Sequence, residues 1–335
     1  MLEELKNNKS AILIILALLL MIVSIVIAIK QYKKYYNLAH PNKTINIVFN
    51  TDASYTEYTK VVIKSAIKTK NTDSVYNINI LCVDLPKNKM EEFKALASKK
   101  LNVFINTIPL ELKTISNVGN YKMDHYVTRA DLFKFLMPDI FPKLDKILYI
   151  DSDTIILKDL SDLYNTDISK NYIGAVMRYD YDFEWKELPN GTWDLRKTYT
   201  YNCGVILFNL KKWRKDHIKD KLIEAKNNDK INDLMTQRSF NEVIPLNKIK
   251  KLSPIYNTFG RMTERDFKVK NFKLLYKPYC DNMDSAEDLF KQAVIIHWAG
   301  HKKPWSYKDV NYADKWWYFA KMINPNWELE PDKTH

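Results

Sequence analysis

Apolar runs of strand length alternate with segments of helical periodicity in the first half of the chain, and this alternation constrains the fold more than any other feature. Short, fully apolar runs between polar turns are typical of buried strands, and they occur at residues 45–49, 78–83, 103–105 and 147–150. Apolar residues at helical spacing occupy the segments between them, at 61–67, 87–100 and 125–141. The alternation predicts an α/β fold with an open, mostly parallel sheet and helices on both faces.

The second half of the chain is less regular. We expect a strand at 202–209, a helix from Leu210, another helix near 229–242, and an apolar run at 294–296 that leads into His297. No internal repeat is visible, so residues 44–310 are interpreted as one domain. Residues 311–335 carry several Trp and Tyr among lysines, which suits either a packed terminal helix or a segment on a membrane interface.

Composition narrows the class of partner. The formal net charge is +12, from 52 Lys and Arg against 40 Asp and Glu, which favours an anionic partner such as a nucleotide phosphate, an acidic acceptor or a membrane surface. The chain has no dominant basic run with interleaved aromatics and no zinc-finger spacing, which argues against nucleic acid. The cysteines Cys82, Cys203 and Cys280 form no CxxC pair, so at most one disulfide is expected and no zinc site.

The N-terminal region carries an uncharged run. Residues 11–29 would span about 28 Å as a helix at roughly 1.5 Å per residue, close to a bilayer core. We predict a single membrane anchor there, between a tail (1–10) and a linker (30–43), with a cleaved signal peptide as the alternative. The side of the membrane stays open, because the lysines after the run favour a cytoplasmic domain, whereas sequons at Asn42 and Asn190 would suit a lumenal one.

Two carboxylates directly follow one of the apolar strands. Asp151 and Asp153 lie beyond its carboxyl end, where ligands bind in open α/β sheets. A sugar diphosphate leaves slowly unless a hard cation neutralises it, and carboxylates are natural ligands of such a cation. The same spacing recurs at Asp180 and Asp182, but no buried strand precedes that pair. The alternatives are a helix N-cap or turn, and a phosphatase of the haloacid dehalogenase type, whose motif Ile155 does not match.

The string from His297 to Trp305 combines residue types that suit a metal-bound phosphate. It reads His-Trp-Ala-Gly-His-Lys-Lys-Pro-Trp and follows an apolar strand. His297 can complete a metal shell with a neutral nitrogen, Gly300 lets backbone N–H groups approach a phosphate, and Lys303 can neutralise that phosphate. A lone His after a strand is more often structural, but the combination in one short string favours a site.

Four segments, taken in order, resemble glycosyltransferase family 8, which includes glycogenin and the bacterial lipopolysaccharide galactosyltransferases. They are residues 45–55 (INIVFNTDASY), residues 128–153, residues 201–213 (YNCGVILFNLKKW) and the HxxGxxKPW string at 297–305. The resemblance implies a GT-A type, Rossmann-like α/β fold with a mostly parallel sheet flanked by helices. It also implies a UDP-sugar donor and a Mn²⁺ or Mg²⁺ ion held by Asp151, Asp153 and His297.

The resemblance implies roles for further residues. The uridine would be bound by Asp52, Ser54 and Tyr55, and the basic residue that the family carries in its second segment would be Lys134 or Arg129. Other donor contacts would come from Ser152, Asn202, Gly300 and Lys303. Gln237 would lie beneath the anomeric carbon and act in catalysis together with Asp151 and Asp153.

One position departs from the family pattern. The family usually has Asp before the Gln, whereas this chain has Thr236 before Gln237. That Asp often helps to hold the hydroxyls of the transferred sugar, so the pattern does not indicate which sugar this chain takes.

The implied function is that of a metal-dependent, retaining glycosyltransferase. It would move a hexose or pentose from a UDP-sugar to a glycan, glycolipid or glycoprotein acceptor. Anchored by its N-terminal helix, it would work in the Golgi or secretory pathway of a eukaryote, or on the cytoplasmic face of a bacterial inner membrane. The alternatives are an inverting transferase and a catalytically inactive, membrane-anchored protein that binds a nucleotide-sugar or glycan on the same fold; Thr236 supports the inactive protein, and the retained metal and phosphate residues oppose it.

Overall fold

The computed structural model describes residues 14, 16–25, 27–28, 44–97, 102–119, 129–179, 199–228, 235–261 and 284–329. Several sequence predictions fall outside these residues, namely the tail at 1–10, the linker at 30–43, the pair Asp180 and Asp182, both sequons and Cys280. The chain divides into two units, Met1–Thr44 and Ile45–His335.

In the first unit, the described residues between 14 and 28 are helical, and their side chains are exposed. Among the described residues, no helix is both long and apolar enough to cross a membrane. The span predicted over residues 11–29 is therefore not confirmed and stays a prediction.

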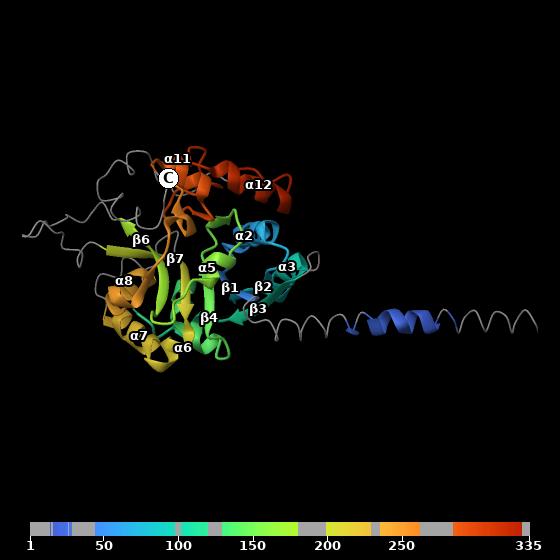
Figure 1. Cartoon of the computed structure of the whole chain (residues 1–335), viewed down its shortest axis with the longest axis horizontal. Helices are drawn as coiled ribbons and strands as arrows, with labels where there is room; N and C mark the ends of the chain where they lie inside the picture. The colour runs from blue at the N-terminus through green and yellow to red at the C-terminus, as the bar shows by residue number, and fades with distance from the viewer. Residues whose placement is uncertain are drawn as a thin grey trace, which may run out of the picture. The chain divides into compact units, whose positions relative to one another are not determined.

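The second unit is built on a seven-stranded sheet (Figure 1). The strand order is β3 (Val103–Leu110), β2 (Val75–Val83), β1 (Thr44–Thr51), β4 (Lys146–Ile150), β7 (Tyr199–Asn209), β6 (Ile173–Tyr179) and β8 (Ile249–Lys251). The pairs β2–β3, β1–β4 and β6–β8 are parallel, whereas β7 runs antiparallel to both β4 and β6. The predicted α/β fold is confirmed, with a mixed sheet in which parallel pairs lie on both sides of one reversed strand.

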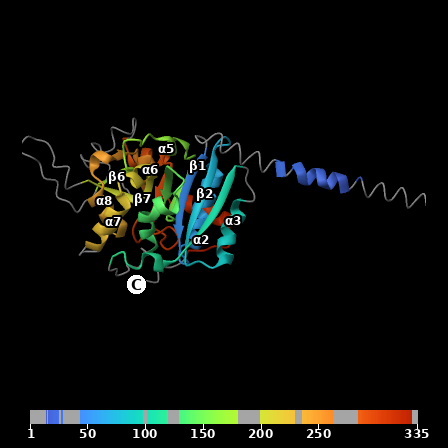
Figure 2. The same ribbon diagram turned by 90° about the horizontal axis from the view of Figure 1, so that it is seen from below.

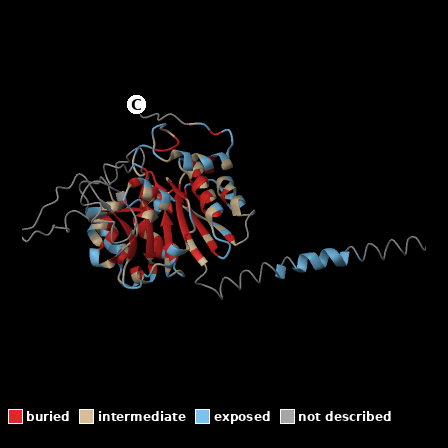
Figure 3. Cartoon of the chain, turned by 45° about the horizontal axis from the view of Figure 1, so that its top comes forward, coloured by how far each residue is buried: buried red, intermediate tan, exposed pale blue. Residues whose placement is uncertain are grey.

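The sheet is buried on both faces, as its nearly continuous apolar strands predict. In β1, the side chains of Ile45, Ile47 and Phe49 enter one core cluster, and Val48 enters the other, as the two-residue period of a strand requires. Figure 2 shows helices on both sides of the sheet, and Figure 3 shows the buried residues concentrated along its strands. One face is covered by α2 (Thr56–Thr69), α3 (Lys87–Ala97) and α12 (Ala313–Ile323), and the other by α4 (Met137–Ile140), α6 (Leu210–Lys215), α7 (Ile218–Asn228) and α8 (Met235–Val243).

A second, three-stranded sheet lies next to the carboxyl end of β4. It consists of β5 (Thr154–Ile156), β10 (Ile295–His297) and β9 (Thr258–Phe259), with β10 antiparallel to β5 and parallel to β9. Only β10 was expected from the sequence. Because these strands are only two or three residues long, their apolar periodicity is too brief to separate them from loops.

The single helix predicted over 125–141 is wrong in its described part. Residues Arg129–Leu136 form a 3₁₀ helix, and a separate α-helix, α4, follows at Met137–Ile140. Pro138 explains the division, because proline has no N–H to continue the hydrogen bonds of a helix but is tolerated in the first turn of a new one. The 3₁₀ helix turns Lys134 inward, where its side chain is 3% exposed.

The C-terminal segment packs on the domain. Helix α12 lies against α2, and Trp316 is fully buried among the rings of Trp305, Tyr58 and Trp327. The sequence allowed either a packed terminal helix or a membrane-interface segment, and the described residues form the packed helix. Tyr318, on the same helix, is 62% exposed.

Replacing Trp316 by Ala should lower the free energy of unfolding by about 3–5 kcal/mol, because it removes a buried indole and leaves a cavity. The same change at Tyr318, which is exposed, should cost at most about 0.5 kcal/mol. Urea denaturation of the two variants beside the parent chain measures both values. Equal and small losses would contradict the packing of α12.

Candidate active site

A cavity of about 720 Å³ opens at the carboxyl ends of β1 and β4. Its wall brings together chain segments that are far apart in sequence: the turn after β1, the 3₁₀ helix, the Asp-Ser-Asp segment, β7, α8 and the string after β10. The sequence-predicted residues that line it are Asp52, Tyr55, Lys134, Asp151, Ser152, Asp153, Asn202, Gln237, His297, Gly300 and Lys303.

Asp151 is fixed by the end of β4. Its backbone N–H donates to the carbonyl of Gly204 on β7 at 2.7 Å, which continues the β4–β7 pairing past Ile150. Its carboxylate accepts from the Tyr149 hydroxyl at 2.7 Å and lies 3.1 Å from Nζ of Lys134. Burial raises the pKa of the Asp151 carboxyl above its ordinary value, and the positive charge of Lys134 opposes that rise.

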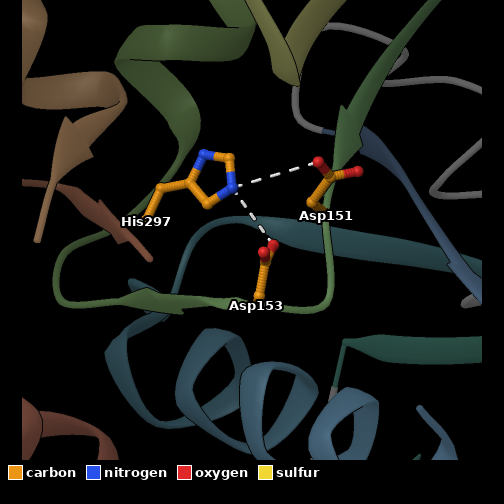
Figure 4. Close-up of side chains that lie close together, drawn as sticks. All are labelled: Asp151, Asp153 and His297. Carbon is orange, nitrogen blue, oxygen red and sulfur yellow. Dashed lines mark ion pairs between the residues drawn. The ribbon is translucent and has the colours of Figure 1, made fainter. Parts of the chain in front are cut away.

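Asp153 and His297 are brought together by strand pairing. Thr154 of β5 is registered with His297 of β10, and the Trp298 N–H donates to the Asp153 carbonyl at 3.0 Å. Nε2 of His297 therefore lies 3.1 Å from Oδ1 of Asp153 and 4.0 Å from Oδ2 of Asp151 (Figure 4). One ligand atom from each of the three residues lies within 4.8 Å of the others.

A chain of hydrogen bonds orients the His297 ring. Nδ1 lies 2.9 Å from Oδ1 of Asn257, whose amide donates to Oδ1 of Asn202 at 3.0 Å. The same Asn202 oxygen accepts the backbone N–H of Gly204 at 2.8 Å. Because the Asn257 oxygen faces Nδ1, the proton of a neutral His297 belongs on Nδ1, and the lone pair of Nε2 points at the carboxylates.

The residue set fits a divalent cation. Two carboxylate oxygens and one imidazole nitrogen converge, and an oxygen-rich set with one imidazole suits Mn²⁺ better than a soft thiophilic metal. Gly204 makes room for this convergence, since a Cβ there would lie 2.3 Å from Cε1 of His297 and 2.7 Å from Oδ2 of Asp151. The glycine is therefore required by the close approach of the backbone to the ligands.

Lys303 and Lys134 supply a buried positive charge to each carboxylate. Nζ of Lys303 donates to Oδ2 of Asp153 at 2.5 Å and to the Trp298 carbonyl at 2.8 Å. Burial alone would raise the pKa of Asp153, but the charge of Lys303 outweighs it and holds that pKa well below its ordinary value. Burial lowers the pKa of Lys134, and its acidic neighbours outweigh that effect as well, so the amine stays charged.

Gly300 has a backbone φ of +97°, and a Cβ there would meet no atom within 4 Å. The glycine is therefore favoured by its backbone conformation and not by lack of space.

The turn after β1 is ordered by Asp52. Its carboxylate accepts from the N–H and hydroxyl groups of Ser54, at 3.0 and 2.6 Å, and from the N–H of Tyr55 at 3.2 Å. Asp52 and Tyr55 reach the cavity, whereas Ser54 is not among its lining residues and supports the turn. The Tyr55 ring contacts Trp305 edge to face, with centroids 6.2 Å apart.

The remaining predicted residues separate into two groups. Asn202 donates its amide to Oε1 of Gln237 at 3.3 Å, so these two residues meet inside the cavity. Ser152 lines the cavity, but its buried hydroxyl already accepts a hydrogen bond from Thr59 and donates one to the Asn50 carbonyl. Arg129 donates to the Ile115 carbonyl at 3.0 Å and is not among the lining residues. Of the two basic candidates in that segment, the structure brings only Lys134 to the carboxylates.

Sequence reasoning missed Asp131 and Asn257. Asp131 lines the cavity and pairs with Lys134 at 2.5 Å. Its signal was present, because an acidic residue three positions before an inward-facing Lys lies on the same side of a helical turn. Asn257 carried no signal, since it lies just before a two-residue strand and only the fold brings it to His297.

The chain matches known glycosyltransferases in sequence. The model of glycosyl transferase family 8 matches residues 46–309. The lipopolysaccharide 1,3-galactosyltransferase of Salmonella typhimurium is 23% identical over 312 residues, which cover 90% of this chain and 86% of that protein. Glycosyltransferase GlyA of Streptococcus pneumoniae is 26% identical over 295 residues, and this chain spans only 36% of its length.

The fold also matches a solved glycosyltransferase. The galactosyltransferase LgtC, solved in complex with donor and acceptor sugar analogs, superposes with a TM-score of 0.63 at 18% identity, covering 83% of this chain and 96% of LgtC. This likeness confirms the GT-A-like α/β architecture. The family match covers most of the chain and contains the carboxylate pair and the His297 string, so the chain belongs to glycosyl transferase family 8 and is a glycosyltransferase.

Proposed function

We propose that the chain transfers a hexose or pentose from a UDP-sugar to a glycan, glycolipid or glycoprotein acceptor, with Mn²⁺ or Mg²⁺ as its cofactor and with retention of anomeric configuration. The observation that carries the proposal is the convergence of Asp151, Asp153 and His297 in a cavity that also holds two buried lysines. A bound divalent cation would neutralise the charge that develops on the departing diphosphate.

The chain's own groups divide the remaining work. Lys303 lies beside Asp153 and Lys134 beside Asp151, and both amines would attract the diphosphate. Asp52 and Tyr55 line the cavity near the turn after β1, where they would meet the edge and the face of the uracil. LgtC, which is similar in fold, was solved with donor and acceptor analogs, and this supports a site that takes both substrates.

Gln237 and Asn202 both line the cavity and are joined by a hydrogen bond. In the proposed reaction the bond from the anomeric carbon to the diphosphate oxygen breaks, and the acceptor hydroxyl forms its bond on the same face. The acceptor proton passes to the departing phosphate oxygen. Gln237 would stabilise the short-lived oxocarbenium ion through its amide oxygen, because an amide is too weak a nucleophile for an easy covalent intermediate.

The donor can be identified by hydrolysis of UDP-glucose, UDP-galactose, UDP-xylose and UDP-N-acetylglucosamine with the chain from residue 44 onward. We expect Mn²⁺-dependent turnover of one donor, abolished by EDTA and lowered at least about a hundredfold in Asp153→Asn, because a charged ligand is lost. Nuclear magnetic resonance of the glycoside formed on an acceptor would reveal its anomer. Binding of UDP without turnover of any donor or acceptor would favour the inactive binding protein, and no binding of UDP would refute the proposal.

The hydrogen bond from Asn257 should matter for the metal although Asn257 is not a candidate ligand. In Asn257→Leu, His297 loses the acceptor on Nδ1, so the affinity for Mn²⁺ should fall roughly 10- to 100-fold. The matched control is Thr258→Val, at the residue that follows Asn257. It removes a buried hydrogen bond from the Thr258 hydroxyl to the Pro254 carbonyl and should leave the affinity unchanged. Calorimetric titration with Mn²⁺ measures both, and an unchanged affinity in Asn257→Leu would contradict the proposed orientation of His297.

We further propose that residues 11–29 anchor the chain in a membrane, on the cytoplasmic face of the inner membrane in a bacterium or in the secretory pathway of a eukaryote. The support is the uncharged apolar run in the sequence. The full chain should sediment with membranes and resist washing with alkaline carbonate, whereas a chain that begins at residue 44 should stay in the supernatant. Recovery of the full chain in the supernatant would refute the anchor.

A further inference from the structure

Asp131 presents a carboxylate to the cavity from the 3₁₀ helix. Its Oδ1 pairs with Nζ of Lys134 at 2.5 Å. Its Oδ2 accepts the hydroxyl of Thr236 at 2.5 Å and the Thr236 backbone N–H at 3.3 Å. The side chain is 16% exposed, so it is held firmly but is still reached from the cavity.

The hydrogen-bonding capacity of Asp131 is incompletely used. A carboxylate offers about four lone-pair sites, and the contacts of the described residues occupy three of them. One site on Oδ1 is left for a donor in the cavity. A negatively charged acceptor repels an anionic group and binds hydroxyl donors strongly, so the complementary ligand chemistry is a polyol.

The contacts of Asp131 connect it to two parts of the cavity. Lys134 connects it to Asp151, since the same amine lies 3.1 Å from Oδ1 of Asp151. Thr236, which binds Asp131, directly precedes Gln237, the residue proposed to lie beneath the anomeric carbon. Asp131 is therefore tied to both the metal side and the reacting carbon of the proposed donor.

Thr236 occupies the position beside Gln237 at which the family usually has a carboxylate. In this chain a carboxylate reaches the same place from another element. It belongs to Asp131, which accepts a hydrogen bond from the Thr236 hydroxyl at the cavity wall. The pair at 131 and 236 still contains one acid and one hydroxyl, but the acid lies on the 3₁₀ helix and the hydroxyl on α8.

We propose that Asp131, held by Thr236 and Lys134, accepts hydrogen bonds from the hydroxyls of the transferred sugar and helps to determine which sugar is used. The inference rests on the proposed function, because it assigns a role within the donor site. It also removes the main support for an inactive protein, since Thr236 no longer implies a missing carboxylate.

Three variants test the assignment. Asp131→Asn keeps the shape of the side chain and removes its charge. The double variant Asp131→Thr with Thr236→Asp moves the carboxylate to the other partner without changing the net charge. Asp139→Asn is the matched control, because Asp139 lies on the next helix, pairs with Lys219 at 2.9 Å and is 56% exposed outside the cavity lining.

The readouts are kcat/KM for hydrolysis of the UDP-sugar that the parent chain uses and, separately, the calorimetric affinity for UDP with Mn²⁺. Asp131→Asn should lower kcat/KM roughly 10- to 100-fold, the value of a hydrogen bond to a charged group, and leave the UDP affinity within about twofold. The double variant should regain most of the lost kcat/KM, and Asp139→Asn should match the parent chain in both readouts.

Unchanged hydrolysis in Asp131→Asn would overturn the inference, and so would a parallel loss of UDP affinity, which indicates a merely structural role. If Asp131→Asn does not fold, as thermal melting would show, the double variant decides alone: retained hydrolysis supports the inference, and lost hydrolysis with intact UDP affinity overturns it. Absence of UDP binding by the parent chain would instead refute the proposed function, and the inference with it.

Discussion

The antiparallel contact between β5 and β10 determines the geometry on which the rest of the site depends. Three registered pairs join these strands, and two of them are pairs of buried isoleucines. The packing of these isoleucines fixes the register without help from polar side chains. A slip of one residue would turn His297 to the opposite face of the small sheet, away from Asp153. The geometry of the candidate metal site thus rests on apolar packing between two segments that are widely separated in the sequence.

Each of the two carboxylates among the candidate ligands has a buried lysine beside it. Asp153 is matched by Lys303 and Asp151 by Lys134, and each amine lies within 3.1 Å of its carboxylate. A buried charge without a partner is costly, so the loss of either member of a pair would leave the other uncompensated. One arrangement therefore serves two needs, since it leaves neither carboxylate as an unpaired buried charge and holds positive charge beside the candidate cation site.

The sequence was informative where chemistry and periodicity coincide, and it failed where contacts are made only in three dimensions. The apolar strand before Asp151 was part of the pattern that predicted the architecture. Together with the string that begins at His297, it also predicted that the three candidate ligands lie in one site. The long helix predicted up to residue 141 was wrong because Pro138 divides it, and apolar periodicity does not register a missing N–H. Asn257 could not be predicted, since its partner His297 lies on another element. The contact of Asp131 with Thr236 on α8 could not be predicted for the same reason.

The aromatic packing of the C-terminal helix has a consequence for the boundary of the functional unit. The family match ends at residue 309, before α12 begins at Ala313. Tyr58 stacks on Trp305 with centroids 3.9 Å apart and on Trp327 at 5.9 Å, and Tyr55 leans on the same Trp305 ring. The last helix thus supports the turn after β1 from behind, and a variant of this chain that ends at residue 309 would lose that support for one wall of the cavity.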